Sequence, residues 1–153
     1  MVLRRIATAT FAVGVCLSAC ATQPKQARPD LDSFKEINDT YGHQAGDDVL
    51  RTIADILKGA VRTSDVVARY GGDEFLLVLP QTSLKGAQEM AERIRIAVQD
   101  AKFEMPGGKS AGTTMSIGVA FYDGTETDID ALIVRIDTAL YVSKRSGKNH
   151  VYS

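Results

Sequence analysis

Residues 66–80 read VVARYGGDEFLLVLP, and this stretch decides the fold. Two runs rich in β-branched and aromatic residues, Val66–Tyr70 and Phe75–Leu79, flank the pair Gly71-Gly72, which is the pattern of a β-hairpin. Glycine has no Cβ atom, so a backbone at this turn can approach a ligand closely. Two carboxylates, Asp73 and Glu74, follow at once, and the hairpin tip is therefore the first candidate site.

Helical patterns surround this hairpin. Ser83–Gln99 has a stripe of apolar residues at helical spacing: Ala87, Met90, Ala91, Ile94 and Val98. Further helices are predicted over Ser33–Thr40, after Gly46 through Ala60, and from a capping Asp128 through Ser143, with strands over Thr113–Phe121 and Val151–Tyr152. This order predicts an α/β (α+β) fold in which helices cover a central, mostly antiparallel sheet.

The N-terminus has the order of a secretory signal peptide. Arg4 and Arg5 precede the apolar run Ile6–Val15, and Leu17-Ser18-Ala19-Cys20 resembles a bacterial lipobox. We predict a signal peptide over 1–19, lipid modification and membrane anchoring at Cys20, a polar tether over 20–29, and a domain over 30–153. The alternative is a stretch that is apolar by chance; lipid labelling at Cys20 separates the two.

Composition narrows the classes of protein. The formal net charge is −1, which gives no reason to expect nucleic-acid binding. Both cysteines, Cys16 and Cys20, lie in the N-terminal segment, so disulfides do not hold the domain together.

Four clusters of polar residues should meet at the strand ends: Asp30–Lys35, Asn38–His43 with Gly46-Asp47, Gly71–Phe75, and Lys144–Asn149. Asp73, Glu74 and Asp30 form a hard oxygen site of the kind that suits Mg²⁺ together with phosphate. Lysines near the end of the last predicted helix can balance phosphate charge, and a carboxylate with an amide suits the edge of guanine. Taken singly, each cluster also fits a plain turn or a solvated charge.

These clusters resemble the GGDEF domain family of diguanylate cyclases. Gly71–Phe75 spells the signature, Asp30–His43 is similar to the first active-site segment, and Ser116–Ala120 is similar to the core strand. Ala139–Tyr141, Lys144 and Gly147–Asn149 resemble the closing helix. The resemblance covers Asp30–Tyr152 and implies a fold related to nucleotidyl cyclases.

The resemblance also implies an activity and a role for each residue. Two GTP molecules, one on each domain of a transient homodimer, would condense to cyclic di-GMP and two pyrophosphates with Mg²⁺ (or Mn²⁺). The implied roles are catalysis by Asp73 and Glu74; metal binding by Asp30, the Leu31 carbonyl, Asp73 and Glu74; guanine binding by Asn38 and Asp47; and triphosphate binding by Lys35, Gly72, Lys144 and Lys148.

A second site is implied by Arg62, Asp65 and Arg93. Their placement resembles the family's inhibitory site for its own product, cyclic di-GMP. The plain alternative is a surface arginine that caps a helix end beside an aspartate.

The chain departs from the family before Asp30. The segment Gln23–Pro29 has two prolines and no apolar run, which argues against a buried strand. We therefore expect the first central strand to be missing, at a loss of about 6–12 kcal/mol. An exported lipoprotein would also lack cytoplasmic GTP. The alternatives to a cyclase are an inactive module that binds cyclic di-GMP or GTP, and a non-catalytic exported lipoprotein.

Overall fold

The computed structural model describes residues 25–122 and 129–153. A five-stranded sheet has the order β2-β3-β1-β6-β7, and a two-stranded sheet is formed by β4 and β5. The elements are β1 (Lys25–Leu31), α2 (Phe34–Tyr41), α3 (His43–Ala60), β2 (Val66–Arg69), β3 (Phe75–Leu79), α4 (Leu84–Asp100), β4 (Phe103–Met105), β5 (Lys109–Ala111), β6 (Met115–Phe121), α5 (Ile129–Arg145) and β7 (Val151–Tyr152). No helix in the described ranges is long and apolar enough to cross a membrane.

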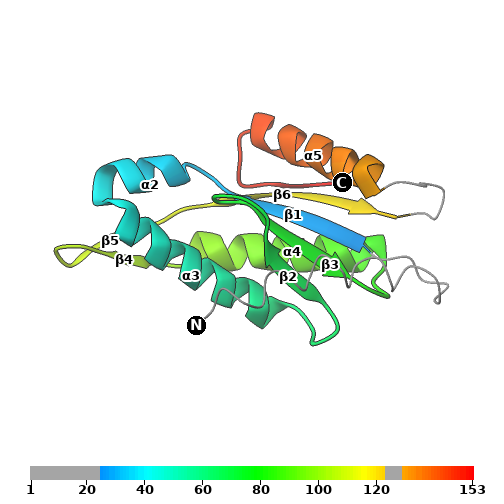
Figure 1. Ribbon diagram of the computed structural model, residues 1–153, viewed down its shortest axis with the longest axis horizontal. Helices are drawn as coiled ribbons and strands as arrows, with labels where there is room; N and C mark the ends of the chain where they lie inside the picture. The colour runs from blue at the N-terminus through cyan, green and yellow to red at the C-terminus, as the bar shows by residue number, and fades with distance from the viewer. Residues whose placement is uncertain (1–24, 123–128) are drawn as a thin grey trace.

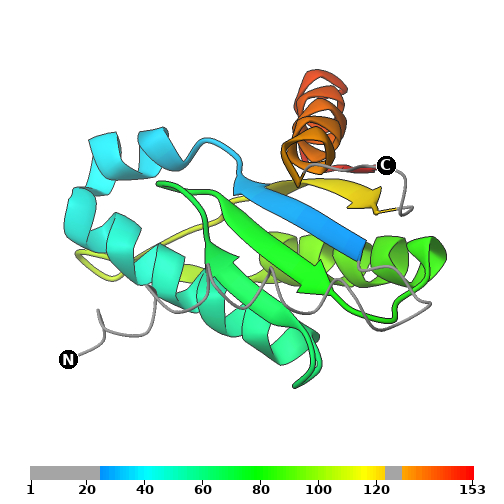
Figure 2. The ribbon, with the colours of Figure 1, turned by 45° about the vertical axis from the view of Figure 1, so that its right-hand side comes forward.

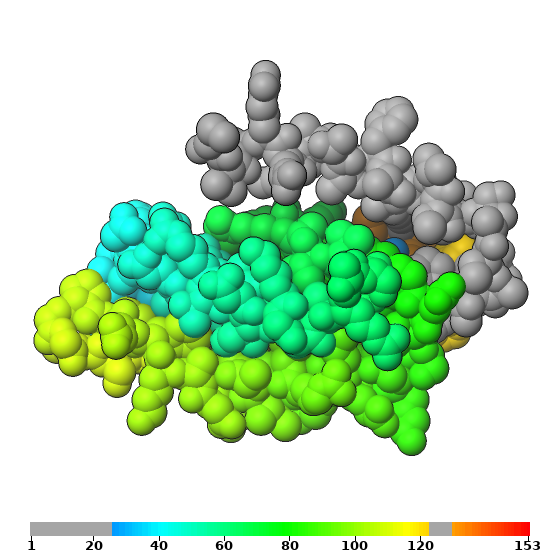
Figure 3. Space-filling model, turned by 90° about the horizontal axis from the view of Figure 1, so that it is seen from below, coloured from blue at the N-terminus to red at the C-terminus, as the bar shows by residue number. Residues whose placement is uncertain are grey.

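The sheet lies between two layers of helices. Helix α5 covers one face, whereas α3 and α4 lie on the other (Figures 1 and 2). Figure 3 shows the outer surface of α2, α3 and α4, with the β4–β5 hairpin at one end. All strand pairs of the main sheet are antiparallel except β6 with β7. The predicted fold class, a mostly antiparallel sheet wrapped by helices, is confirmed.

The main core fills the space between the sheet and α3 and α4. The whole predicted apolar stripe of α4 is buried, and the side chain of Ser83 caps the helix by accepting a hydrogen bond from the Gly86 amide at 3.0 Å. On the other face, Leu132 and Ile136 of α5 pack against Ala120 of β6. The hydrophobic spacing in α4 was therefore sufficient to identify its inner face.

The expectation that the first central strand is missing is wrong. Residues 25–31 form β1, which lies between β3 and β6 at the centre of the sheet. Its register with β6 runs without a break from Lys25↔Phe121 to Leu31↔Met115. The predicted tether is consequently a strand over residues 25–29, while residues 1–24, with Cys20 and the predicted signal peptide, lie outside the described residues.

Pro29 is tolerated because it lies where the pairing of β1 with β3 is interrupted. This pairing runs from Lys25 to Ala27 and resumes as a single bridge between Asp30 and Glu74. The same register puts Pro29 opposite Phe75, where a residue with an N–H group would donate to β3. The strand loses about one hydrogen bond there rather than its place in the sheet.

Strand β1 also needs fewer apolar side chains than expected. Only the face toward α3 and α4 needs apolar groups, and Ala27 and Leu31, both buried, supply them. On the α5 face β1 places Gln26, Arg28 and Asp30, all buried. Arg28 and Asp30 each form ion pairs on this face, although Arg28 Nε and Asp30 Oδ1 have no hydrogen-bond partner, so a polar segment can occupy a central position.

The small hairpin of β4 and β5 was not predicted. Its strands have three residues each and flank the turn Pro106-Gly107-Gly108, in which both glycines have positive φ. Strands this short carry too few residues for an alternating pattern. The predicted cap Asp128 lies outside the described residues.

Candidate active site

The hairpin tip is tied to the end of β1 by backbone contacts. Asp30 bridges to Glu74, and the Leu31 amide donates to the Asp73 carbonyl at 3.3 Å. The tip is closed by the Tyr70 amide, which donates to the Glu74 carbonyl at 2.9 Å, and by the Arg69 guanidinium, whose Nη2 donates to the Gly72 carbonyl at 2.7 Å. The sheet register therefore brings Asp30, Asp73 and Glu74 to one edge.

Asp30 is the most deeply buried acid at this edge. Its side chain is 3% exposed, and its Oδ2 accepts an ion pair from Lys144 of α5 at 2.6 Å. Its other carboxylate oxygen, Oδ1, is buried and has no hydrogen-bond partner. Burial raises the pKa of Asp30, Lys144 opposes this, and the nearby charges of Asp73 and Glu74 raise it further.

Glu74 is held by a cation from β1. Arg28 Nη2 donates to Glu74 Oε2 at 2.7 Å, and Arg28 Nη1 pairs with Asp137 of α5. The guanidinium also lies over the Tyr70 ring, 4.4 Å from its centroid. Burial by itself would lower the pKa of Arg28, but the hydrogen bonds that Arg28 donates to Glu74 and Asp137, and the charges of these carboxylates, outweigh it and raise the pKa. Arg28 could not be recognised from the sequence because it lies in the segment interpreted as a tether.

The predicted metal ligands share one edge but do not converge on one point. In the part of the chain that the structure describes, no three acid, histidine or cysteine side chains are grouped to hold a metal ion. Asp30 and Glu74 instead face Lys144 and Arg28. The donor set nevertheless fits Mg²⁺, which takes one or two carboxylates and completes its shell with phosphate oxygens and water. The unpartnered Oδ1 of Asp30 is a ready ligand of the right chemistry.

The predicted guanine-binding residues lie between α2 and α3. Asn38 packs against Gly46 so closely that a Cβ atom on Gly46 would overlap the Asn38 amide oxygen and come within 3.1 Å of the Phe34 ring. Asp47 follows Gly46 and is exposed. The glycine in the first turn of α3 thus makes room for the Asn38 side chain.

Two of the predicted triphosphate ligands besides Lys144 are exposed lysines. Lys35 lies in the first turn of α2, and Lys148 Nζ donates to Ser33 Oγ at 3.2 Å. Ser33 and Lys148 both have positive φ, 59° and 62°, so the backbone is strained on both sides of this contact. A pocket of about 630 Å³ opens beside them, between α2 and the segments that precede β6 and β7.

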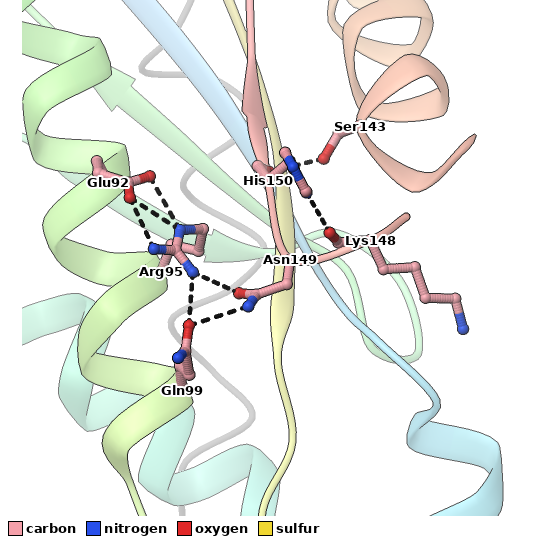
Figure 4. A network of polar contacts seen from close by, with 7 residues as sticks. All are labelled: Glu92, Arg95, Gln99, Ser143, Lys148, Asn149 and His150. Atoms are coloured by element: carbon pink, nitrogen blue, oxygen red, sulfur yellow. Dashed lines mark hydrogen bonds and ion pairs between the residues drawn. The ribbon is translucent and has the colours of Figure 1, made fainter. Parts of the chain in front are cut away.

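Asp32 and Asn149 fix the segment that carries Lys148. Buried Asp32 accepts hydrogen bonds from Thr114 Oγ1 at 2.7 Å, Ser116 Oγ at 2.8 Å and the Asn149 amide at 3.0 Å. Figure 4 shows the Asn149 side chain bound to Arg95 and Gln99 of α4, while the Lys148 side chain points away from this network. Asp32 was assigned no role from the sequence, although it belongs to the segment Asp30–His43 that resembles the family.

The predicted inhibitory residues lie away from the hairpin tip. Arg62 and Asp65 form the turn between α3 and β2, where the Arg62 amide donates to Asp65 Oδ2 at 2.8 Å. Arg93 lies on α4. Both arginine side chains are exposed. The backbone bond to Asp65 shows that this aspartate has a structural role in the turn whatever else it binds.

The fold and the acidic hairpin tip define an α+β domain with carboxylates and lysines gathered at one edge of its sheet. A family model described as "Diguanylate cyclase, GGDEF domain" matches residues 28–150, and the chain belongs to this family. It is 48% identical over 122 residues to diguanylate cyclase A of Treponema denticola and 45% identical over 122 residues to diguanylate cyclase DosC of Escherichia coli. Each match covers 80% of this chain, but only 33% and 26% of the relatives, so the chain spans about a third or less of their length.

Solved structures of similar domains agree with this fold. The GGDEF domain of DgcB from Caulobacter crescentus, in complex with c-di-GMP, matches with a TM-score of 0.82 at 34% identity over 86% of this chain and 77% of that one. The active GGEEF domain of a diguanylate cyclase from Vibrio cholerae matches with a TM-score of 0.78 at 32% identity over 94% and 88%. The fold of the described residues is therefore that of a GGDEF domain.

Proposed function

We propose that this chain is a diguanylate cyclase that condenses two GTP molecules into cyclic di-GMP and two pyrophosphates. The observation that carries the proposal is the register of β1 with β3, which places Asp30 against Glu74 and leaves Asp30 Oδ1 buried without a partner. A buried, unsatisfied carboxylate oxygen is costly in a domain that only has to be stable. It is expected where a ligand completes the site.

The side chains of this edge then have separate roles. Asp30, Asp73, Glu74 and the Leu31 carbonyl would hold Mg²⁺ or Mn²⁺. The bound ion would neutralise phosphate charge and lower the pKa of the attacking 3′-hydroxyl. Lys144 is 39% exposed, so it can exchange Asp30 for a triphosphate oxygen when GTP arrives. Glu74 lies beside the reacting hydroxyl as ligand or base, as the resemblance implies.

Residues on α2, on α3 and on the loops beside them would bind the nucleotide. Asn38 and Asp47 would pair with the guanine edge, and Lys35, Lys148 and the backbone at Gly72 would contact the triphosphate. Since each domain binds one GTP and each 3′-hydroxyl attacks the other α-phosphate, turnover needs two copies of the domain face to face.

The test is a product assay on the chain with GTP and Mg²⁺. We expect cyclic di-GMP, with a specific activity that rises with protein concentration because the active species is a dimer. Loss of product on addition of EDTA is the control. Soluble, folded protein that makes no cyclic di-GMP at any concentration would contradict the proposal. The same assay with added cyclic di-GMP, on the natural chain and on Arg62→Ala, tests product inhibition.

The contact between Gly46 and Asn38 predicts a specific defect in nucleotide binding. In Gly46→Ala the new methyl group displaces the Asn38 amide, so the Michaelis constant for GTP should rise about 3- to 10-fold, the worth of one hydrogen bond. Gly59→Ala, on the same helix with no atom near its Cβ position, should leave it unchanged. An unchanged constant in Gly46→Ala would show that Asn38 does not bind guanine.

A further inference from the structure

Arg28 contacts the proposed metal site from β1, the central strand that was expected to be missing. Its side chain is 11% exposed, and its guanidinium joins Glu74 of the hairpin to Asp137 of α5. The Tyr70 ring covers it on one side. Arg28 is therefore a fixed, buried cation whose partner is one of the proposed metal ligands.

The guanidinium and a divalent cation compete for the same carboxylate. Arg28 Nη2 donates to Glu74 Oε2 at 2.7 Å and so occupies one of the two oxygens of this carboxylate. Within the described residues Arg28 and Lys144 together neutralise two of the three acids at this edge. A metal ion that takes Glu74 Oε2 as a ligand must first separate this oxygen from Arg28.

Asp137 makes this separation possible. A buried arginine that lost its only carboxylate would be left as an uncompensated charge, which is strongly unfavourable. Arg28 keeps a second carboxylate, Asp137, and the face of Tyr70 when Glu74 leaves. Arg28 therefore keeps a carboxylate partner on α5 that is not one of the proposed metal ligands.

We propose that Arg28 is a built-in competitor of the divalent cation, which holds Glu74 in the metal-free domain and withdraws to Asp137 when the metal binds. The inference rests on the proposed metal site of the cyclase. It assigns to Arg28 a positioning role: Arg28 acts on the metal through Glu74, and sets how much Mg²⁺ or Mn²⁺ is needed to fill the site.

The test measures metal binding rather than turnover. Free Mn²⁺ is followed by electron paramagnetic resonance as the chain is titrated with a non-hydrolysable GTP analogue present. Arg28→Leu should lower the dissociation constant for Mn²⁺ about 3- to 10-fold, because a partly exposed ion pair no longer has to be broken. Arg51→Leu, which removes an exposed arginine paired with Asp48 on α3, is the matched control and should change nothing.

A second set of variants separates the specific pair from general charge repulsion. In a Glu74→Gln background Arg28→Leu has no ion pair to release, so its effect on Mn²⁺ binding should disappear. Loss of a repulsive charge alone would persist in that background through Asp30 and Asp73, and such persistence would overturn the inference. Arg28→Lys keeps the positive charge but loses the planar guanidinium. Its dissociation constant for Mn²⁺ should lie between those of the natural chain and Arg28→Leu. Arg28→Gln replaces Arg28→Leu if the latter does not fold.

The failure of this inference differs from the failure of the proposed function. If Asp73→Asn does not weaken Mn²⁺ binding by the chain, the metal site itself is absent. Both the proposed function and the role of Arg28 are then overturned. If the natural chain binds Mn²⁺ but Arg28→Leu binds it no more tightly, only the role of Arg28 is overturned.

Discussion

Asp30→Asn is expected to unfold at a higher temperature than the natural chain while it loses at least about 1,000-fold in cyclic di-GMP synthesis. The loss of activity follows from the proposed role of Asp30 as a ligand, since a neutral amide holds a divalent cation poorly. The gain in stability follows from burial. The carboxylate is 3% exposed and one of its oxygens has no partner.

The sign of the stability effect comes from the pKa of Asp30. Burial raises this pKa above its ordinary value, and the Lys144 ion pair does not fully offset it. A carboxyl with a higher pKa in the folded state stabilises the fold below its unfolded pKa, and this contribution is lost as the pH rises through the folded pKa. The melting temperatures of the two proteins should therefore be close in acid and separate toward neutral pH, by about 2–4 °C for a gain near 1 kcal/mol.

Lys144→Gln is the informative control because it changes the other partner. Lys144→Gln leaves Asp30 buried without a cation, so the melting temperature of this variant should fall. In Asp30→Asn, by contrast, the Lys144 side chain can turn to water. Circular dichroism melts from pH 4 to pH 8 would check both variants. A neutral-pH melting temperature for Asp30→Asn below that of the natural chain would mean that the ion pair outweighs the burial of the carboxylate.

The helices show what the sequence alone could predict. The stripe of α4, the β2–β3 hairpin and the terminal strand β7 all follow from local spacing and turn chemistry, and all are confirmed. The carboxylates at the hairpin tip were recognised from their chemistry, and the resemblance assigned them catalytic and metal-binding roles. The register of β1 with β3 supplies what the resemblance could not, the pairing of Asp30 with Glu74.

The error at β1 has a physical cause that no local pattern reveals. A central strand is normally recognised by its apolar residues, and this one is polar on one face and carries Pro29. Its place is stabilised by partners far away in the sequence: β6 through backbone bonds, Asp137 and Lys144 through ion pairs. Arg28 could not be recognised as a neighbour of Glu74 while its strand was interpreted as a tether.

Gly118→Ala is expected to lower the melting temperature by about 10 °C, the largest effect of a single methyl group in the described chain. Gly118 lies in β6 where the backbone of α5 closely approaches the sheet. A Cβ atom there would lie 2.5 Å from the Ile136 carbonyl oxygen and 2.6 Å from the Leu140 amide nitrogen. Both are backbone atoms, so no side-chain rotation relieves the overlap and α5 must shift away. Overpacking of this kind costs about 2–3 kcal/mol.

The displacement of α5 should also reach the active site, because this helix carries Lys144 and Asp137. Gly59→Ala is the matched control: it adds the same methyl group to helix α3 where nothing lies within 4 Å, and it should stabilise the chain by about 0.5–1 kcal/mol through helix propensity. Opposite signs for the two variants in thermal melts would show that the close approach of α5 to β6, and not the loss of glycine, decides the result. If Gly118→Ala melts with the natural chain, α5 is not held against the sheet at this distance, and its ion pairs with Asp30 and Arg28 cannot be a fixed part of the site.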